Sequence, residues 1–330
     1  MYKRKKMSYS KINCYDSCGF QYYLKYVCGK YIFKDNVANT FGSLVHYILE
    51  QEANCIKNDE DINYDILKDV FLHTKPSSIG SKDKEQILGI DKIATNFPME
   101  WHKISDKSGK SYEQKAHDFL KMGLYDFPIY MYEHPELEII GAEVPFEFEY
   151  KGYLFNGFID LVLRNKETGT YIIWDTKTKD HRFSDKEVIT PLQFVCYCYA
   201  LSLKYGENAT FECYYYLPII RELQSAGTKG FIQRGLKKID KLLSGIEEAV
   251  YEPHPTPLCY WCEFCNANPN VSEEGKNLCP YYSLWTPEDR KNFKTKLPWL
   301  GMDKHFIQVK KLEQLEALET ANEDDEVFEI

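Results

Sequence analysis

Apolar and polar positions alternate most regularly between residues 152 and 178, and this pattern predicts two β-strands joined by a turn. The first run, 153–164, is rich in the aromatic and β-branched residues that favour strands. Residues 165–170 contain the asparagine and glycine that favour a turn. The second run, 171–178, is apolar at first and polar at its end. We therefore expect a hairpin here.

Three charged side chains interrupt or end these two apolar runs. Asp160 follows an apolar stretch of the first strand, and Asp175 and Lys177 lie two residues apart on the second, hence on the same face. Such groups are costly to bury without partners, and the simple alternative is that they emerge into solvent. Because two carboxylates and a lysine converge at one end of the hairpin, we favour a site that holds a hard divalent cation and directs a water molecule.

The segments around the hairpin predict further strands and several helices. Residues 138–150 alternate like a strand, and a turn at Lys151 and Gly152 would pair them antiparallel with the first strand of the hairpin. Glu143, near the start of this strand, could face the acidic end of the hairpin. A last strand is expected at 212–218. Helical patterns cover 21–27, 40–55, 64–73, 111–125, 190–205 and 231–250, after a first helix that Ser8 or Ser10 would cap.

Two of these helices carry polar residues that allow two interpretations. His46 lies beside an apolar helix face, where a lone histidine is more often a packed or hydrogen-bonded core residue. Gln193 falls at the third position of a helix that Thr190 would begin, so it could complete a capping box. Tyr197 lies four residues further on and shares a helix face with Gln193.

Composition indicates a folded protein without a membrane-spanning segment. Of the 330 residues, 44% are hydrophobic and 15% aromatic, enough for a packed core. No apolar run approaches the roughly 20 residues that span a bilayer, and the basic N-terminus has no hydrophobic region behind it, so we expect a cytoplasmic protein without a signal peptide. The net charge of −9 argues against a generally basic nucleic-acid coat, although not against a local binding groove.

The cysteines indicate a metal site. Eleven cysteines in a cytoplasmic chain do not predict a disulfide framework. Cys259, Cys262 and Cys265 form a C-x2-C-x2-C pattern, and 13 residues separate Cys265 from Cys279. Such close spacing in a loop is typical of thiolate ligands for zinc or for an iron–sulfur cluster. The alternative is a set of unligated core thiols.

The order of motifs resembles a known family. The chain is similar to the PD-(D/E)XK nuclease superfamily, in particular to the RecB-like iron–sulfur exonucleases, which include CRISPR-associated and phage-encoded members that act in DNA recombination and repair. The resemblance is carried by the segments SYSKINCYDSCGFQYYLKY, FGSLVHYILE, NGFIDLV, IIWDTKT and QFVCY. It implies an α/β fold, a restriction-endonuclease-like mixed sheet flanked by helices. It also implies one nuclease domain over 1–310, with a helical insertion at 56–135 and a cysteine region at 253–285 that packs with the N-terminal segment.

The resemblance also implies roles for individual residues. It places the metal ligands at His46, Asp160, Asp175 and the carbonyl of Thr176, and so reverses the first interpretation of His46. The residues expected to act in catalysis are Asp160, Asp175, Lys177, Gln193 and Tyr197. The ion would be Mg²⁺ or Mn²⁺, with Mn²⁺ slightly favoured because imidazole is a softer ligand than carboxylate.

In that family one N-terminal and three C-terminal cysteines hold a 4Fe–4S cluster. The matching positions here are Cys18, Cys259, Cys262 and Cys279, and Cys265 could replace one of them. The usual proline after the first cysteine is Gly19 in this chain. A local zinc site made only of the four C-terminal cysteines is the alternative.

These implications lead to one expected function and two rivals. The expected function is a divalent-metal-dependent deoxyribonuclease, an exonuclease acting on single-stranded DNA ends. One rival is a catalytically silent DNA-binding or scaffolding protein on a nuclease fold with a zinc or iron–sulfur site, and the other is a zinc-ribbon interaction protein. The acidic tail, 311–330, could bind a protein partner. Cleavage polarity and oligomeric state do not follow from the sequence.

Overall fold

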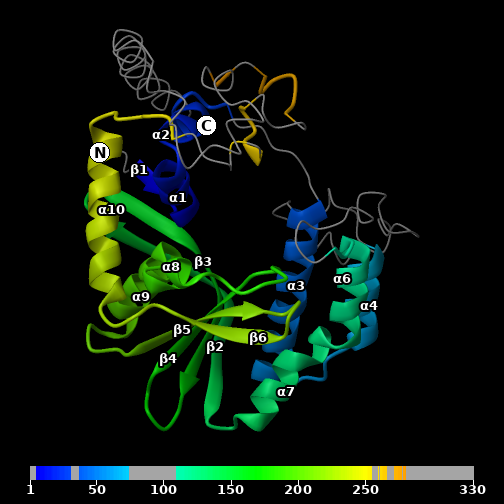
Figure 1. Cartoon of the computed structure of the whole chain (residues 1–330). Helices are drawn as coiled ribbons and strands as arrows, with labels where there is room; N and C mark the ends of the chain where they lie inside the picture. Colours follow the sequence, from blue (N-terminus) through cyan, green and yellow to red (C-terminus); the bar gives the residue numbers. More distant parts are fainter. Residues whose placement is uncertain are drawn as a thin grey trace, which may run out of the picture. The chain divides into compact units, whose positions relative to one another are not determined.

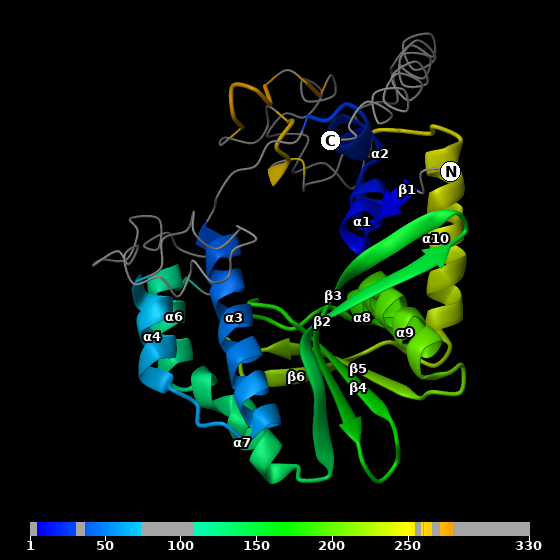
Figure 2. The same ribbon diagram turned by 180° about the vertical axis from the view of Figure 1, so that it is seen from behind.

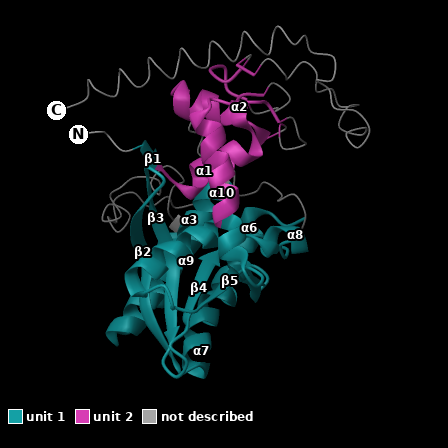
Figure 3. Cartoon of the chain, turned by 90° about the vertical axis from the view of Figure 1, so that its left-hand side faces the viewer, with its two compact units in different colours: residues 1–6, 34–235 teal, residues 7–33, 236–330 magenta. Residues whose placement is uncertain are grey.

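Figures 1 and 2 show the computed structural model of the chain, which describes residues 5–30, 37–73, 109–254, 259, 261–265, 271–276 and 278–279. The chain divides into two compact units, shown in Figure 3. Unit 1 comprises Met1–Lys6 and Lys34–Gly235, and unit 2 comprises Met7–Phe33 and Leu236–Ile330. The predicted single domain over 1–310 stays a prediction, and the acidic tail lies outside the described residues. Among those residues, no helix has both the length and the apolar character needed to cross a bilayer.

Unit 1 is built around a six-stranded mixed sheet. Its strands run in the order β1-β3-β4-β5-β6, and β2 also pairs with β3. β4 and β5 are parallel, whereas the pairs β2–β3, β3–β4 and β5–β6 are antiparallel. This mixed sheet flanked by helices confirms the predicted fold class. The strands are β1 (Lys5–Met7), β2 (Leu137–Tyr150), β3 (Tyr153–Asn165), β4 (Tyr171–Thr176), β5 (Phe211–Leu217) and β6 (Glu222–Ala226).

The expected hairpins form with the expected turn residues. Lys151 and Gly152 both have positive φ angles, 48° and 79°, as a tight two-residue hairpin turn requires. Between β3 and β4, the side-chain oxygen of Asn165 accepts hydrogen bonds from the N–H groups of Glu167 and Thr168. The local conformation of each turn thus sets the register of its hairpin.

β2 and β3 extend well beyond β4. β4 pairs with β3 only between Leu161 and Arg164, whereas β2 follows β3 to the turn at the other end. We call the part of this hairpin from 143 to 160 the outer ribbon. Since β2 occupies one edge of β3 and β4 occupies the other edge at 161–164, β1 must pair with β3 within the outer ribbon.

Helices cover the sheet of unit 1 and form a second core beside it. One cluster of buried residues joins α3, α4 and α6 through the rings of Phe41, Phe71 and Phe119. The other joins the sheet to α3 and α7 and centres on Trp174, whose ring contacts Phe127. The helices are α3 (Val37–Asn58), α4 (Tyr64–His73), α6 (Tyr112–Lys121), η5 (Gly123–Tyr125), α7 (Asp126–Glu133), α8 (Asp185–Ile189) and α9 (Leu192–Tyr205).

The start of α9 differs from the expected one. The helix begins at Leu192, with Pro191 rather than Thr190 at the N-cap, and no side chain caps it. The capping box at Gln193 is therefore not formed, because proline has no side-chain acceptor to cap the first turn. The Gln193 side chain is left available for a contact outside the helix.

Unit 2 joins both ends of the chain. It contains α1 (Tyr9–Ser17), α2 (Gly19–Tyr22), the π-helix η1 (Tyr23–Val27) and most of α10 (Phe231–Glu247). Ser8 caps α1 by accepting a hydrogen bond from the N–H of Lys11. The Tyr15 hydroxyl donates to the carbonyl of Val250 at 2.6 Å, and its ring contacts Tyr251 edge-on. The N-terminal helices are thus fixed to the chain that follows α10.

Candidate active site

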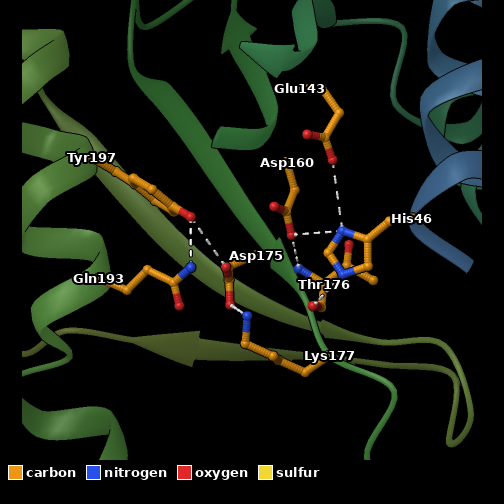
Figure 4. Close-up of polar contacts among 8 residues, drawn as sticks. All are labelled: His46, Glu143, Asp160, Asp175, Thr176, Lys177, Gln193 and Tyr197. Atoms are coloured by element: carbon orange, nitrogen blue, oxygen red, sulfur yellow. Dashed lines mark hydrogen bonds and ion pairs between the residues drawn. The ribbon is translucent and has the colours of Figure 1, made fainter. Parts of the chain in front are cut away.

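A cluster of polar side chains lies where β3 and β4 stop pairing (Figure 4). The last pair is Leu161 with Trp174. Beyond it, Oδ2 of Asp160 accepts a 2.7 Å hydrogen bond from the N–H of Thr176. β2 continues along the other edge of β3, so Glu143 lies opposite Asp160. The fork between the strands therefore brings two carboxylates to the end of β4.

His46 reaches this cluster from α3, whose residues Leu44, Val45 and Ile48 are buried in the core. Its Nε2 is 3.0 Å from the carbonyl oxygen of Thr176. Its Nδ1 is 3.4 Å from Oδ2 of Asp160 and 3.8 Å from Oε1 of Glu143. The imidazole therefore lies between both carboxylates and the backbone of β4.

The side chains of His46, Glu143 and Asp160 each offer one ligand atom, and these atoms lie within 4.8 Å of one another. Within the described part of the chain, no other group of three or more histidine, cysteine or acidic residues has this spacing. Carboxylate oxygens with an imidazole nitrogen are donors that suit Mg²⁺ or Mn²⁺.

Burial and neighbouring negative charge make Asp160 and His46 hold their protons more tightly than usual. Burial raises the pKa of Asp160 to about 6, which His46 opposes and the charge of Asp175 reinforces. Burial alone would lower the pKa of His46, but the nearby carboxylates of Asp160 and Glu143 raise it above its ordinary value. Both shifts favour the proton-bound forms. A divalent cation would supply the same positive charge in place of the protons, so the donor set fits a metal ion.

A second set of contacts lies beside the first, on β4 and α9. The buried carboxyl of Asp175 contacts Nζ of Lys177 at 2.5 Å through Oδ2, and its Oδ1 accepts a 3.5 Å hydrogen bond from the Tyr197 hydroxyl. Nε2 of Gln193 donates to the same hydroxyl at 2.6 Å. The N–H of Lys177 donates to the carbonyl of Tyr216, which ties the residue after β4 to β5. Burial, and then the charge of Asp175, raises the pKa of Tyr197, so its hydroxyl stays protonated and donates.

A small pocket opens beside His46, Glu143 and Asp160. Its lining also includes apolar side chains, among them Leu49 and Trp174. Charges that line such a pocket are less screened by water than charges on an open surface.

A family model for the PD-(D/E)XK nuclease superfamily matches residues 6–267. The chain belongs to this superfamily. A similar solved structure is that of a "putative exonuclease" from Eubacterium rectale, with 13% sequence identity, a TM-score of 0.43, and coverage of 84% of this chain and 92% of that chain. No curated protein sequence matches the chain. The expected resemblance to the PD-(D/E)XK nuclease superfamily is confirmed, and the nucleases of this superfamily use divalent metal ions.

This PD-(D/E)XK nuclease brings the predicted site residues together at one end of β4. The two sets of contacts share the backbone of Thr176, which lies between Asp175 and Lys177. Asp175 lies outside the closely spaced group of three, because its carboxyl turns toward Lys177 and Tyr197. The individual roles predicted for these residues stay predictions.

Glu143 is part of the cluster but was not among the predicted ligands. The signal for it was present in the sequence. A two-residue turn at 151 and 152 pairs Tyr150 with Tyr153, and counting back along both strands places Glu143 opposite Asp160. Glu143 also has a positive φ of 46°, a conformation uncommon for a residue other than glycine.

The predicted cluster cysteines surround one pocket, which lies entirely within unit 2. Its volume is about 220 Å³. The cysteines that line it are Cys18, Cys259, Cys262, Cys265 and Cys279. No three of these thiols come within 4.8 Å of one another. Ligands of one tetrahedral zinc ion, at about 2.3 Å from the metal, would lie closer together than that.

The backbone around these cysteines is arranged in short turns. The N–H of Cys262 donates to the carbonyl of Cys259, and the N–H of Cys265 donates to that of Cys262. The N–H of His254 donates to Sγ of Cys18 at 3.4 Å. Burial raises the pKa of both Cys18 and Cys262. Their thiols are therefore protonated in the absence of a metal, and a bound metal would displace those protons.

Proposed function

We propose that this nuclease is a divalent-metal-dependent deoxyribonuclease that acts as an exonuclease on single-stranded DNA ends and carries a structural 4Fe–4S cluster. The observation that supports the metal-dependent activity is the group of His46, Glu143 and Asp160 beside the Asp175–Lys177 ion pair. The choice of DNA, single strands and ends rests on the resemblance of the motifs to the RecB-like exonucleases.

The ion would be held by His46, Asp160, Asp175 and the carbonyl of Thr176, as predicted, with Glu143 as an additional ligand. When bound, a divalent cation polarises the scissile phosphate and lowers the pKa of a water molecule. The raised pKa values of Asp160 and His46 support this assignment, because burial disfavours the Asp160 carboxylate and the carboxylates of Asp160 and Glu143 favour a positive charge beside them.

Lys177 would orient the attacking water, or accept a proton from it, and balance negative charge on the phosphate. Its side chain is 34% exposed, whereas its partner Asp175 is fully buried. The ammonium group can thus contact a substrate on one side while Asp175 restrains it on the other. Gln193 and Tyr197 would act as positioning residues, because their hydrogen bonds hold the Asp175 carboxyl from the side of α9.

The cluster would be held by Cys18, Cys259, Cys262 and Cys279, with Cys265 as the alternate ligand. The spacing of the thiols around the pocket supports a group larger than one zinc ion. Its proposed role is structural, since it would join the N-terminal helices of unit 2 to the segment after α10.

The test is digestion of single-stranded DNA, labelled at either end, by anaerobically purified protein with Mg²⁺ or Mn²⁺. We expect stepwise cleavage from one end, abolished by Asp160→Ala and by Lys177→Ala while circular dichroism shows an intact fold. Full activity in either variant would contradict the proposal. Metal-independent DNA binding without cleavage by the unaltered protein would instead support the silent scaffold.

A further inference from the structure

Phe158 is a large apolar side chain on β3 that the core does not use. It is 59% exposed, although Phe155 and Ile159 on the same strand are buried. The core beneath the outer ribbon is already filled by Phe146, whose ring packs directly against Gly157 and contacts Tyr197. A single exposed aromatic residue is common on protein surfaces and does not by itself indicate a function. The position of Phe158 relative to the proposed metal site is the reason to assign it one.

That position is beside the proposed metal ligands. Phe158 and Asp160 are two residues apart on β3, which places them about 7 Å apart along the strand. Across the hairpin, Pro145 is the partner of Phe158 and is also exposed. Phe158 and Pro145 therefore form an exposed apolar patch on the outer ribbon, two residues along β3 from the proposed ligand Asp160. We call this patch the aromatic platform.

Positive charge lies along the same part of β3. β1 pairs with β3 within the outer ribbon, and its residues Lys5 and Lys6 are both exposed. An aromatic platform with lysines on the adjacent strand is the combination that binds single-stranded nucleic acid, whose bases stack while its phosphates contact cations.

We propose that Phe158 stacks on an unpaired base next to the phosphodiester held at the metal site, and that this contact selects single strands. The inference rests on the proposed nuclease function and adds a residue that determines substrate class. Inside a duplex both faces of a base are covered by the adjacent base pairs, so the ring could stack only on the terminal pair. Because every base offers a flat face, the contact discriminates strandedness and not sequence.

The experiment compares Phe158→Ala, Phe158→Trp and the unaltered protein on single-stranded oligonucleotides. One oligonucleotide is intact, and the others each carry a single abasic site at one of the first nucleotides from the cleaved end. Tyr132→Ala, which removes an 87% exposed aromatic ring from α7, is the matched control. Initial rates with Mn²⁺ give KM and kcat separately.

We expect Phe158→Ala to raise KM for the intact strand by roughly 5- to 100-fold with little change in kcat, since stacking contributes equally before and during the reaction. A strand with an abasic site at one of these positions should raise the KM of the unaltered protein by a similar factor and leave the KM of Phe158→Ala unchanged. Phe158→Trp should restore the KM for the intact strand. Unchanged kinetics in Phe158→Ala, or an equal loss on intact and abasic strands, would overturn the stacking role while the nuclease stands. Absence of both cleavage and binding by the unaltered protein would overturn the proposed function and this inference together.

Discussion

Nζ of Lys177 lies 2.5 Å from Oδ2 of Asp175, and only the lysine side of this ion pair is open to solvent. Asp175 is fully buried on β4, where an isolated carboxylate would be costly. Lys177 therefore has two duties in the proposed mechanism: it neutralises a buried acid and presents a cation toward the substrate. The two duties can be separated by mutation.

Lys177→Ala should lower the free energy of unfolding by about 1–3 kcal/mol, because it leaves the buried carboxylate of Asp175 without a cation. The double variant Lys177→Ala with Asp175→Asn should recover much of this loss and still cleave no DNA. Urea denaturation measures the first effect and strand digestion the second. Additive stability losses in the double variant would show that the two side chains do not depend on each other.

Glu143→Gln should weaken Mn²⁺ binding by at least about tenfold, since it removes one of the two carboxylates nearest His46. Calorimetric titration of the protein with Mn²⁺ measures the change. Glu147→Gln is the control, because Glu147 is exposed on the same strand and outside the cluster. Equal affinity in the two variants would remove Glu143 from the ligand set.

Glu52 should make stability fall as pH rises. It is fully buried on α3, and neither carboxyl oxygen has a hydrogen-bond partner among the described residues. Burial, reinforced by the charge of Asp126, raises its pKa well above 4.5. The folded state therefore binds the proton more tightly than the unfolded state, so this contribution is complete below pH 4.5 and is lost at higher pH.

Glu52→Met should consequently stabilise the protein by about 1–3 kcal/mol at pH 8 and by less at pH 5. Thermal unfolding at both pH values measures the difference. Glu60→Gln, at an exposed position just after α3, is the control. A gain from Glu52→Met that is the same at both pH values would mean that Glu52 does not titrate in this range.

The ion pair between Lys115 and Asp180 should hold the loop after Lys177. Nζ of Lys115, on α6, is 3.2 Å from Oδ2 of Asp180, and both side chains are buried. Lys115→Met should lower stability by about 3 kcal/mol, because it leaves a buried acid whose remaining contacts include His181. It should also reduce kcat. Lys115→Met with Asp180→Leu should regain stability, measured by denaturation, and unchanged stability in the single variant would contradict this account.

Serine variants of the cysteines should differ in whether the purified protein keeps its visible absorption. Replacing Cys18, Cys259, Cys262 or Cys279 by serine should remove iron, sulfide and visible absorption from anaerobically purified protein. Cys265→Ser should retain them. Zinc in place of iron, with Cys18→Ser unaffected, would favour the local zinc site.

Much of the fold was predictable because its signals are local. The Lys151-Gly152 turn, the Asn165–Thr170 turn and the alternation along β2 and β3 each act over a few residues. The short helix α8 was missed although Ser184 and Glu187 form a local capping box at its start. The short segments α7 and β6 were missed because they are held by distant partners. For example, Arg221 forms two hydrogen bonds with Asp126, which lies 95 residues earlier.

The site was predictable to the extent that its motifs keep a fixed order in the chain. His46 and Gln193 have ordinary structural interpretations when taken alone, and only the resemblance to a family assigned them to the site. The orientation of Asp175 toward Lys177 depends on where β4 separates from β3, which no pattern of residues along the chain records. Glu143 required the hairpin register, which the turn supplies.

The division of the chain into units also has a consequence for the order of folding during synthesis. All residues of unit 1, the proposed catalytic residues included, have left the ribosome once Gly235 is free. Cys18 belongs to unit 2 and must wait for Cys259 and the cysteines after it. The catalytic centre can thus form on the nascent chain before the cluster pocket exists, so loading of the proposed 4Fe–4S cluster would be a late step in the maturation of this nuclease.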